Sequence, residues 1–547
     1  MTVRNNRRVI TAISALALTG VGLAACGGGD GGSGSGSGSD GTLRLGLGEP
    51  QNLIPANIQE TEGGEIADRL YAGLYTYDME GNLAPVLADG VPTTEDNKVW
   101  TIKLQEGFTF QNGEEITAET FVKSWNYTVY GENANYGAGF FKQIDGWAEM
   151  QLGEDPDGDG PEEAAKPEAT ELSGVKAVDP LTLEVTLAEP WVGFPVTLGY
   201  TAFMPMADEC LADIDACNET PIGNGPYKID GKWNHNSSIH MEKWADYKGT
   251  QPSIERIEYK IYTGDATAWP DFEAGKIDIA APGAEEYEVA KAEYGDAMRE
   301  EETGQTWGLG FPVYDEKFSD PNVRKAFSMA IDRQGYIDGL FQGRYTVANS
   351  YTPAVIPGYL EGTCGEACTF DPEAAKQLLA DTDFPMDQPV ELWVNSGPGE
   401  DYLKVLGDQL AANLGITYEL KTLEWPDFLG KKDGHELTGP FLTGWSPDYP
   451  LNQNYLEPLY GNGPDGNDFG FHGEEFEQLL AEGNRAETLS DAMTKYQEAE
   501  KVLAADLPVA PIWVTRTATV IGENVDPDSF QRNPILGTID INSLKLL

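Results

Sequence analysis

The sequence has few basic residues, very few histidines and few cysteines. Its 547 residues contain 36 Lys+Arg against 90 Asp+Glu, with 4 His and 5 Cys, and the formal net charge is −54. Proteins bind nucleic-acid phosphates and anionic membrane surfaces mainly through Lys and Arg, so this balance argues against both partners. The body of the chain also lacks an apolar run of about 18 residues, the length that a membrane-spanning helix needs.

Motifs of common enzymes are missing as well. No His-Glu-x-x-His, Gly-x-Ser-x-Gly or P-loop pattern occurs, and the spacing of His235, His240, His435 and His472 suits no zinc site. With 90 acidic residues, carboxylate pairs arise by chance and do not identify a glycosidase. We therefore predict a binding protein without a cofactor or metal. A hydrolase held at the cell surface is the alternative from another class.

The start of the chain has the features of an export signal. Three arginines precede the apolar run 9–25, which ends in Leu23-Ala-Ala-Cys26. A charged start, an apolar stretch and small residues at the cleavage point are typical of a secretory signal. The sequence Leu-Ala-Ala-Cys resembles the bacterial lipobox, in which the cysteine, here Cys26, receives a diacylglyceryl group. An ordinary signal peptide with a chance cysteine is the alternative.

The segment after Cys26 is rich in Gly and Ser, a composition typical of a flexible tether. We predict a signal peptide at 1–25, a tether at 26–41 and a body anchored by lipid on the extracytoplasmic face of the cell membrane. The pair Arg7-Arg8 lacks the flanking residues of a twin-arginine signal, which favours the general secretory route.

The four remaining cysteines are Cys210, Cys217, Cys364 and Cys368. An even number in an exported protein indicates disulfides, although four cysteines allow three connectivities. The short spacings favour two local pairs, 210 with 217 and 364 with 368. No histidine lies near either pair in sequence to complete a metal site.

One acidic segment is a weak candidate for a cation site. Asp155, Asp157, Asp159 and Gly160 resemble the first half of a calcium loop. The twelfth position is Lys166, where such loops carry a bidentate Glu. A solvated acidic loop is the preferred interpretation, and calcium binding is the alternative.

The body of the chain alternates short strands and helices. Its content of 40% hydrophobic and 10% aromatic residues is enough to build cores, and its length suggests three or four structural units. Period-two patterns predict strands at 42–48, 100–104, 181–187, 254–262, 389–395, 416–422 and 508–514. Helical spacing predicts helices at 66–74, 118–130, 323–341, 399–413, 424–430 and 487–506, and another after the N-cap Asp371. This order indicates an α/β protein with at least two lobes.

Six segments, in order, resemble one known family. They are Leu70-Tyr-Ala-Gly-Leu74 with Gly81–Ala88, Trp100–Gly113, Ile116–Trp125, Pro221–Tyr227, Val323–Arg333 and Glu424–Phe428. Together they resemble the extracellular solute-binding proteins of ABC importers, family 5, the oligopeptide- and dipeptide-binding group. The stretch Trp100–Gly113 is the most specific, and the resemblance extends from about residue 42 to 515.

The resemblance implies a two-lobed, three-domain periplasmic-binding-protein-like fold of type II, which closes on its ligand about a hinge. By analogy, lobe I contains residues 42–82, 205–303 and 508–547, an extra domain at 83–204 is attached to it, and lobe II contains 304–507. The two chain crossings of the hinge are expected near 303–308 and 505–510.

The resemblance also implies a ligand site at Gly444–Tyr449. In peptide-binding members the aspartate of this Trp-x-x-Asp motif holds the α-ammonium group of the peptide, a role that carries over to Asp448. Trp445 and Trp425 match family aromatics that line the pocket. Tyr449 and Tyr136 are added as further ligand-binding candidates. A charge-assisted bond in a closed cleft is strong, although members that bind other solutes can carry the same aspartate.

The resulting hypothesis is a lipid-anchored, monomeric receptor of an ABC importer. It captures oligopeptides or dipeptides outside the membrane and delivers them to the permease, whose ATPase subunits supply the energy. The alternative keeps the fold and changes the solute to an oligosaccharide, an opine-like compound or a metal chelate.

Overall fold

The structure is a computed structural model that describes residues 41–153, 165–462 and 467–547. The predicted signal peptide, Cys26, most of the tether and the acidic loop Asp155–Gly160 lie outside the described residues. Within them, no helix has the length and apolar character that crossing a bilayer requires.

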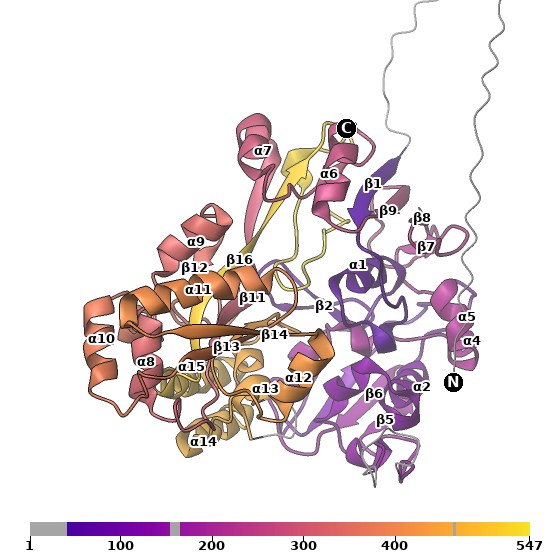
Figure 1. The fold of residues 1–547 in the computed structure, drawn as a ribbon. Coiled ribbons are helices and arrows are strands. Elements are labelled where there is room, and N and C mark those ends of the chain that lie inside the picture. The colour runs from indigo at the N-terminus through magenta and orange to yellow at the C-terminus, as the bar shows by residue number, and fades with distance from the viewer. Residues whose placement is uncertain (1–40, 154–164, 463–466) are drawn as a thin grey trace, which may run out of the picture. The chain divides into compact units, whose positions relative to one another are not determined.

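The largest sheet consists of two halves with the same strand order. One half contains the indigo strand near the N-terminus and the other contains the orange-brown strands near residue 400 (Figure 1). In the first half-sheet, β1 (Thr42–Leu47) lies between β9 (Arg256–Ile261) and β10 (Ile279–Ala280) and is parallel to both. In the second half-sheet, β13 (Val390–Asn395) lies between the parallel strands β14 (Tyr418–Leu423) and β15 (Phe441–Trp445). Parallel strands place their carboxyl ends at one edge, where α/β proteins bind their ligands.

Two long antiparallel strands connect the half-sheets. β11 (Met298–Gly310) pairs with β16 (Val509–Ile521) over almost its whole length. β11 also pairs with β15, and β16 pairs with β10, so the two connecting strands belong to both halves. Their register shifts between Glu302 and Thr306. Such an irregularity bends a strand locally, which makes this point a natural hinge.

The connecting strands correct the prediction from sequence. The strand expected at 508–514 continues to Ile521, and β11 was not among the predicted strands. The residues opposite the register shift are Val514 and Arg516, several positions beyond the crossing expected near 505–510. Polar residues make up much of β11 between Arg299 and Thr306, which hides its strand character from a hydrophobicity pattern.

A smaller antiparallel sheet has the order β4-β6-β5. It contains β4 (Val99–Lys103), β6 (Thr182–Thr186) and β5 (Val175–Asp179), and α2 (Ala118–Val129) packs against it. This part of the chain contacts the C-terminal end of α14 (Glu474–Asn484) and the residues after it, in the second half of the molecule. The Val192 amide donates to the carbonyl of Asn484 at 2.9 Å, and the Asn97 side chain donates to the carbonyl of Ala486 at 2.9 Å.

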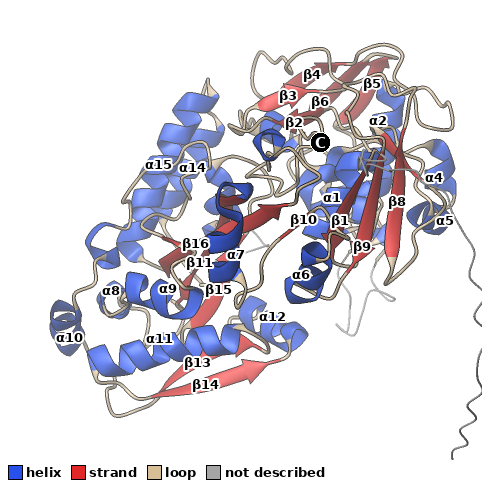
Figure 2. Cartoon of the chain, turned by 90° about the horizontal axis from the view of Figure 1, so that it is seen from above, coloured by secondary structure: helices blue, strands red, loops and turns tan. Residues whose placement is uncertain are grey.

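Helices cover the sheets, and Figure 2 shows α11 (Gly399–Leu414) lying along β13 and β14. The other helices are α1 (Thr61–Leu70), α3 (Phe194–Thr197), α4 (Asp208–Ala212), α5 (Ile214–Glu219), α6 (Asp265–Glu273), α7 (Tyr287–Tyr294), α10 (Pro372–Ala380), α12 (Trp425–Asp433), α13 (Glu457–Tyr460), α14 (Glu474–Asn484) and α15 (Leu489–Asp506), with α8 and α9 below. Short strands complete the elements: β2 (Tyr75–Tyr77) pairs with β3 (Leu83–Pro85), β7 (Tyr227–Ile229) and β8 (Ser238–Lys243) extend the first half-sheet, and β12 (Thr346–Val347) pairs with β16.

The single helix predicted over 323–341 is wrong, because the structure has two. α8 (Pro321–Met329) and α9 (Arg333–Phe341) are separated by a break at Asp332. The Asp332 carboxylate accepts a hydrogen bond from the Gly335 amide at 2.9 Å and so caps α9. The buried Arg333 side chain donates to the Ser328 carbonyl at 3.0 Å, which also accepts the Ile331 amide at 3.2 Å, so the start of α9 is bonded to the end of α8.

The structure pairs the cysteines as their spacing predicts. Cys210 in α4 lies at disulfide distance from Cys217 in α5, with their Cα atoms 5.1 Å apart. Cys364 lies at disulfide distance from Cys368 in the loop before α10, with a Cα separation of 5.6 Å.

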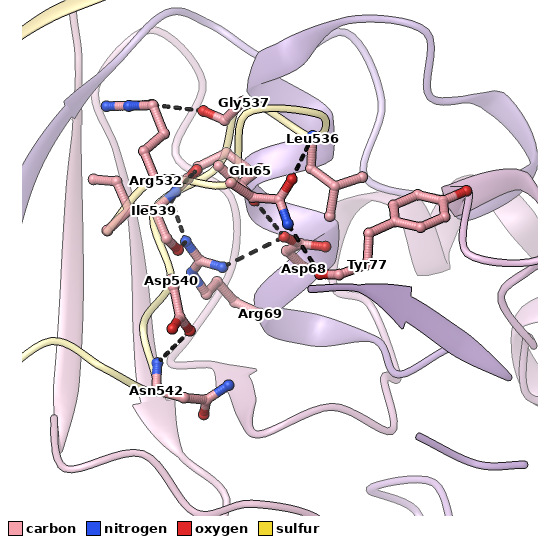
Figure 3. A network of polar contacts seen from close by, with 12 residues as sticks. Glu65, Asp68, Arg69, Tyr77, Arg532, Leu536, Gly537, Ile539, Asp540 and Asn542 are labelled. Carbon is pink, nitrogen blue, oxygen red and sulfur yellow. Dashed lines mark hydrogen bonds and ion pairs between the residues drawn. The ribbon is translucent and has the colours of Figure 1, made fainter. Parts of the chain in front are cut away.

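The end of the chain is fixed to α1 by a buried polar network (Figure 3). Arg69, which is 2% exposed, makes an ion pair of 2.7 Å with Glu65 and donates to the Ile539 carbonyl at 2.6 Å. The Thr538 hydroxyl donates to Asp68 at 2.6 Å. Burial raises the pKa of Asp68, although the positive charge of Arg69 opposes this shift.

Candidate functional site

The Trp-x-x-Asp motif lies where the second half-sheet meets the connecting strands. Trp445 is the last residue of β15 and pairs with Thr306 of β11, directly at the register shift. From there the chain leaves the sheet toward Asp448. Gly304, inside the irregular part of β11, has no side chain, and a Cβ there would come within 2.5 Å of Pro447. The motif and the bend are therefore in direct contact.

One side chain, that of Asn454, fixes both ends of the motif. Its Nδ2 donates to Asp448 Oδ2 at 3.1 Å, and its Oδ1 accepts from the Asp448 backbone amide at 3.0 Å. The same Oδ1 accepts from the indole nitrogen of Trp445 at 3.3 Å. Asn454 belongs to a 3-10 turn, Asn452–Tyr455, and is 1% exposed, so these bonds form away from water.

The carboxyl group of Asp448 is electrostatically strained. Burial raises its pKa to about 6, while the hydrogen bond from Asn454 and the charge of Lys142 favour the ionised form. Burial, and after it the negative charge of Asp448, raises the pKa of both Tyr200 and Tyr455, so these phenols stay protonated. Within the described residues no cation lies at ion-pair distance from Asp448. The site therefore favours the arrival of a cation.

A cavity of about 440 Å³, which we call the aromatic cavity, has Trp445 in its wall. Asp448 is not one of its lining residues, but Asn454 joins it to Trp445 by hydrogen bonds. The lining also includes Trp425 and, from the small-sheet part of the chain, Lys142. Further aromatic side chains in the lining are Trp307, Tyr351, Tyr455, Tyr460 and Phe469. An ion pair of 2.7 Å between Lys432 and Asp468 adds opposite charges to the wall. Aromatic walls with a few polar anchors are usual for ligand sites.

Two predicted ligand residues lie elsewhere. Tyr449 is buried, donates to Gln453 Oε1 at 2.8 Å and packs against Trp191, with ring centroids 6.3 Å apart. Tyr136 is 58% exposed, and its amide donates to Asn57 Oδ1 at 3.0 Å. Neither residue lines the aromatic cavity. The structure thus places Trp445 and Trp425 in the wall of the cavity and joins Asp448 to Trp445 through Asn454, whereas Tyr449 and Tyr136 lie elsewhere.

Sequence reasoning missed several residues of the site, above all Asn454, Tyr455 and Lys142. The run Asn452-Gln-Asn454 is polar, which predicts exposure, yet all three residues are at most 2% exposed. Its position a few residues after the motif was the only signal. Lys142 is distant in sequence and carried no signal.

Two parallel half-sheets, two connecting strands and a ligand-sized cavity at their junction define a two-lobed binding protein of the type II periplasmic class. The small sheet forms its third domain. The comparisons with known proteins agree with this assignment. The chain belongs to the bacterial extracellular solute-binding proteins, family 5, whose middle-region model matches residues 82–467.

Similar proteins cover nearly the whole chain. The oligopeptide-binding protein OppA of Bacillus subtilis (strain 168) is 25% identical, over 87% of this chain and 88% of that protein. The probable deoxycholate-binding periplasmic protein YgiS of Escherichia coli (strain K12) is 26% identical, over 85% and 86%. The structure of the Escherichia coli murein tripeptide binding protein MppA has the same fold, with a TM-score of 0.73 at 21% identity, over 92% and 98%.

Members of this family are extracytoplasmic solute-binding proteins of ABC importers, which supports the prediction of a binding protein rather than an enzyme.

Proposed function

We propose that this protein captures peptides outside the cytoplasm and delivers them to the permease of an ABC importer. The observation that carries the proposal is the half-buried Asp448 carboxylate, which has no cation at ion-pair distance among the described residues and which Asn454 joins to Trp445 in the wall of the aromatic cavity. A peptide supplies the two groups that this site lacks, an ammonium group for the carboxylate and side chains or backbone to cover the aromatic wall. Peptide-binding relatives such as OppA of Bacillus subtilis support the same reading.

The clamp on the ammonium group follows from electrostatics. A carboxylate with a raised pKa gains more from a bound cation than an exposed one, because water no longer screens the pair. Tyr200 and Tyr455, whose phenols stay neutral beside Asp448, add polar groups without a competing charge. Recognition of the terminal amine selects peptides by their end and tolerates varied side chains.

Lipid anchoring through Cys26, cleavage after residue 25 and a tether at 26–41 are parts of the same proposal. Their support is the sequence Leu23-Ala-Ala-Cys26 and the Gly/Ser composition that follows. Membrane fractionation with mass spectrometry of wild-type protein and Cys26→Ala tests them. The wild type should remain with the membrane and carry acyl mass on Cys26, and the variant should be released.

For the domains, we propose the expected limits of 42–82, 205–303 and 508–547 for lobe I, 83–204 for the extra domain and 304–507 for lobe II. The connecting strands give one amendment to these limits: residues 509–513 of β16 belong to lobe II, because Ala510, Ile512 and Trp513 pack in its core with α8 and α11.

We also propose that both cysteine pairs are oxidised in the exported protein and that the protein works as a monomer. Thiol labelling before and after reduction tests the former.

A non-peptide solute is the second candidate. A relative of similar identity is described as a probable deoxycholate-binding protein, and the aromatic wall of the cavity would suit a large apolar solute too. Mass spectrometry of whatever co-purifies after gentle denaturation separates the candidates. We expect peptides. Thermal-shift screening adds a second test, because a ligand that binds only the native state raises the melting temperature. A shift with a sugar, bile acid or metal chelate but none with di- to hexapeptides would refute the peptide proposal.

A further inference from the structure

A second cavity, of about 850 Å³, lies beside α1 and is here called the tyrosine cavity. Its walls come from the end of α1, from the segment 71–80, from the loop 247–250 and from the C-terminal residues between 533 and 542. Among the described residues, none lines both this cavity and the aromatic cavity. Its volume falls in the range of small-molecule sites, about 300–1,000 Å³.

The C-terminal segment forms a fixed wall of the tyrosine cavity. The Asn533 side chain donates to the Tyr77 carbonyl at 3.0 Å, and the Thr538 hydroxyl donates to Asp68 at 2.6 Å. Figure 3 shows this wall, with Asp68 and Tyr77 beside the C-terminal segment. Asn533 and Thr538 are both buried, so these bonds form away from bulk water. The wall is therefore in place before a ligand arrives.

Two buried donors belong to residues of this lining and have no partner. The Tyr71 hydroxyl and the Arg69 Nε form no hydrogen bond with any described residue. Both residues are 2% exposed. Burial raises the pKa of Tyr71, so its hydroxyl stays protonated and remains a donor. A buried donor without a partner destabilises the protein, and oxygen atoms of a ligand would supply the missing acceptors.

The other tyrosine hydroxyls of the lining differ in their contacts. Those of Tyr75 and Tyr77 donate to backbone carbonyls at 3.1 and 2.7 Å and are engaged. The Tyr247 hydroxyl forms no hydrogen bond with another described residue. It lies against Gly249, where a Cβ would come within 2.4 Å of it. The absence of a side chain at Gly249 therefore permits the position of the Tyr247 ring.

Carboxylates outnumber cations in the lining. The carboxylates are Asp68, Asp78, Glu80 and Asp540, and the cations are Arg69 and Lys248. Arg69 is already paired with Glu65 at 2.7 Å. Lys248 donates to the Glu106 carbonyl and lies 5.5 Å from the ring centroid of Phe108. The excess of negative charge repels an anionic ligand and accepts a neutral one.

We propose that the tyrosine cavity binds a neutral polyhydroxylated molecule, a saccharide, at a site separate from the proposed peptide site. Hydroxyl groups both accept and donate hydrogen bonds. A sugar therefore accepts from the Tyr71 hydroxyl and the Arg69 Nε, and donates to the carboxylates of the same lining. The aromatic rings of the lining offer apolar surface to the C–H groups of the sugar ring.

NMR saturation-transfer titration of the whole protein with glucose and with glucuronate tests the inference. The two sugars share a ring and differ in charge. We expect saturable binding of glucose and at least tenfold weaker binding of glucuronate, because the lining carries excess negative charge. Absence of saturable glucose binding would refute the proposal, and so would glucuronate binding as tight as that of glucose.

Tyr71→Phe removes only the unpartnered hydroxyl. It should weaken glucose binding at least tenfold without lowering the melting temperature of the sugar-free protein. Tyr77→Phe is the matched comparison for stability, because it removes a bonded hydroxyl of the same lining and should lower the melting temperature. An equal fall in Tyr71→Phe would show that its hydroxyl has a partner and would contradict the inference.

Gly249→Ala changes the cavity from its other side. The new Cβ would displace the Tyr247 ring, and we expect at least a tenfold loss of glucose affinity. Gly339→Ala in α9, where a Cβ meets nothing within 4 Å, is the matched control and should bind glucose as wild type does. Unchanged glucose binding in Gly249→Ala would contradict the placement of the sugar. Melting temperatures verify that both variants are folded.

Competition separates this inference from the proposed function. A saturating tetrapeptide should not displace glucose, and Asp448→Asn should bind glucose as tightly as wild type. Displacement by the peptide, or loss of glucose binding in Asp448→Asn, would place the sugar in the aromatic cavity and refute the inference. If glucose binds as expected and no peptide binds, the proposed function fails and the saccharide site stands.

Discussion

Asn454 holds Asp448 by two hydrogen bonds, donating to the carboxylate at 3.1 Å and accepting from the backbone amide at 3.0 Å. The same amide oxygen receives the indole N–H of Trp445 at 3.3 Å. One buried side chain therefore sets the position of both the charged and the aromatic member of the motif. It does so without lining the aromatic cavity itself.

Replacing Asn454 should weaken ligand binding through this positioning. In Asn454→Ala, Asp448 and Trp445 lose their common partner, and we expect about a tenfold loss of peptide affinity, the equivalent of about 1.4 kcal/mol. The pKa of Asp448 should rise further, because the hydrogen bond from Asn454 favours the ionised form. Calorimetry at several pH values measures both effects. Asn133→Ala, an exposed asparagine bonded to the Tyr127 carbonyl, is the control, and an equal loss there would contradict the assignment.

Peptide affinity should depend on pH through Asp448. Burial raises its pKa from 3.8 to about 6, and only the carboxylate form attracts an ammonium group. Affinity should therefore fall as pH drops below about 6, approaching tenfold per pH unit, while the ligand amine stays charged. Titrations between pH 4.5 and 7 measure this, and Asp448→Asn should give a weak and nearly flat profile. A wild-type profile equally flat would show that Asp448 does not ionise on this range.

Without ligand, the stability of the protein should depend on pH with the opposite sign to peptide affinity. The folded state binds a proton on Asp448 more readily than the unfolded state, so the stability contributed by its protonated form is present below about pH 4. That contribution is lost as pH rises through about 6. Asp448→Asn should therefore be more stable than wild type at pH 7, by of the order of 1–3 kcal/mol in denaturant titration.

The network in Figure 3 should matter for stability alone. Arg69→Met leaves Glu65 and Asp68 buried without their cation, and we expect a loss of about 3–5 kcal/mol in the free energy of unfolding. Adding Glu65→Gln should restore part of it, because one uncompensated charge is removed. Arg299→Gln, on a partly exposed arginine 3.9 Å from Asp528, should change the free energy of unfolding by less than about 1 kcal/mol. An equal loss of unfolding free energy in Arg69→Met and Arg299→Gln would contradict a special role for the buried ion pair between Arg69 and Glu65.

Gly304 should couple the bend in β11 to the motif. A Cβ at this position would lie 2.5 Å from Pro447 and 2.9 Å from the Tyr455 hydroxyl, which donates to the Gly304 carbonyl at 2.5 Å. Gly304→Ala should displace the loop that carries Asp448 and lower peptide affinity about tenfold, at a stability cost of about 1–3 kcal/mol.

The matched control is Gly339→Ala in α9, where a Cβ meets nothing within 4 Å. Small-angle scattering with and without peptide adds a second measurement. Wild type and the control should become more compact on binding, and Gly304→Ala should respond less. If Gly304→Ala bound peptide and became compact as wild type does, the bend in β11 would not be coupled to the loop that carries Asp448.

Sequence patterns predicted the elements whose burial is one-sided and failed where structure depends on distant partners. The strand β1 and the helix α2 have clear periodic patterns and match their expected ranges. The strand β11 escaped notice because polar residues from Arg299 to Thr306 are paired by β16, far away in sequence. The break at Asp332 depends on a side-chain cap that competes with a continuous apolar stripe.

Some residues of the candidate site could likewise be predicted from sequence, and others could not. Asp448, Trp445 and Trp425 lie in short motifs, so the sequence alone could single them out as candidate ligand residues. Tyr449 directly follows the motif but is buried in the core, where its ring packs beside Trp191 and its hydroxyl donates to Gln453. Lys142 and Asn454 acquire their positions only when separate segments of the chain come together around the connecting strands.

The most direct test of the central claim is calorimetric titration of wild type and Asp448→Asn with one tetrapeptide, used with a free and with an acetylated N-terminus. The account predicts that wild type binds the free form at least a hundredfold more tightly than the acetylated form, since a buried, unpaired charge costs about 3 kcal/mol or more. It predicts that Asp448→Asn loses this preference. Equal binding of both peptides by wild type, or an undiminished preference in Asp448→Asn, would contradict it.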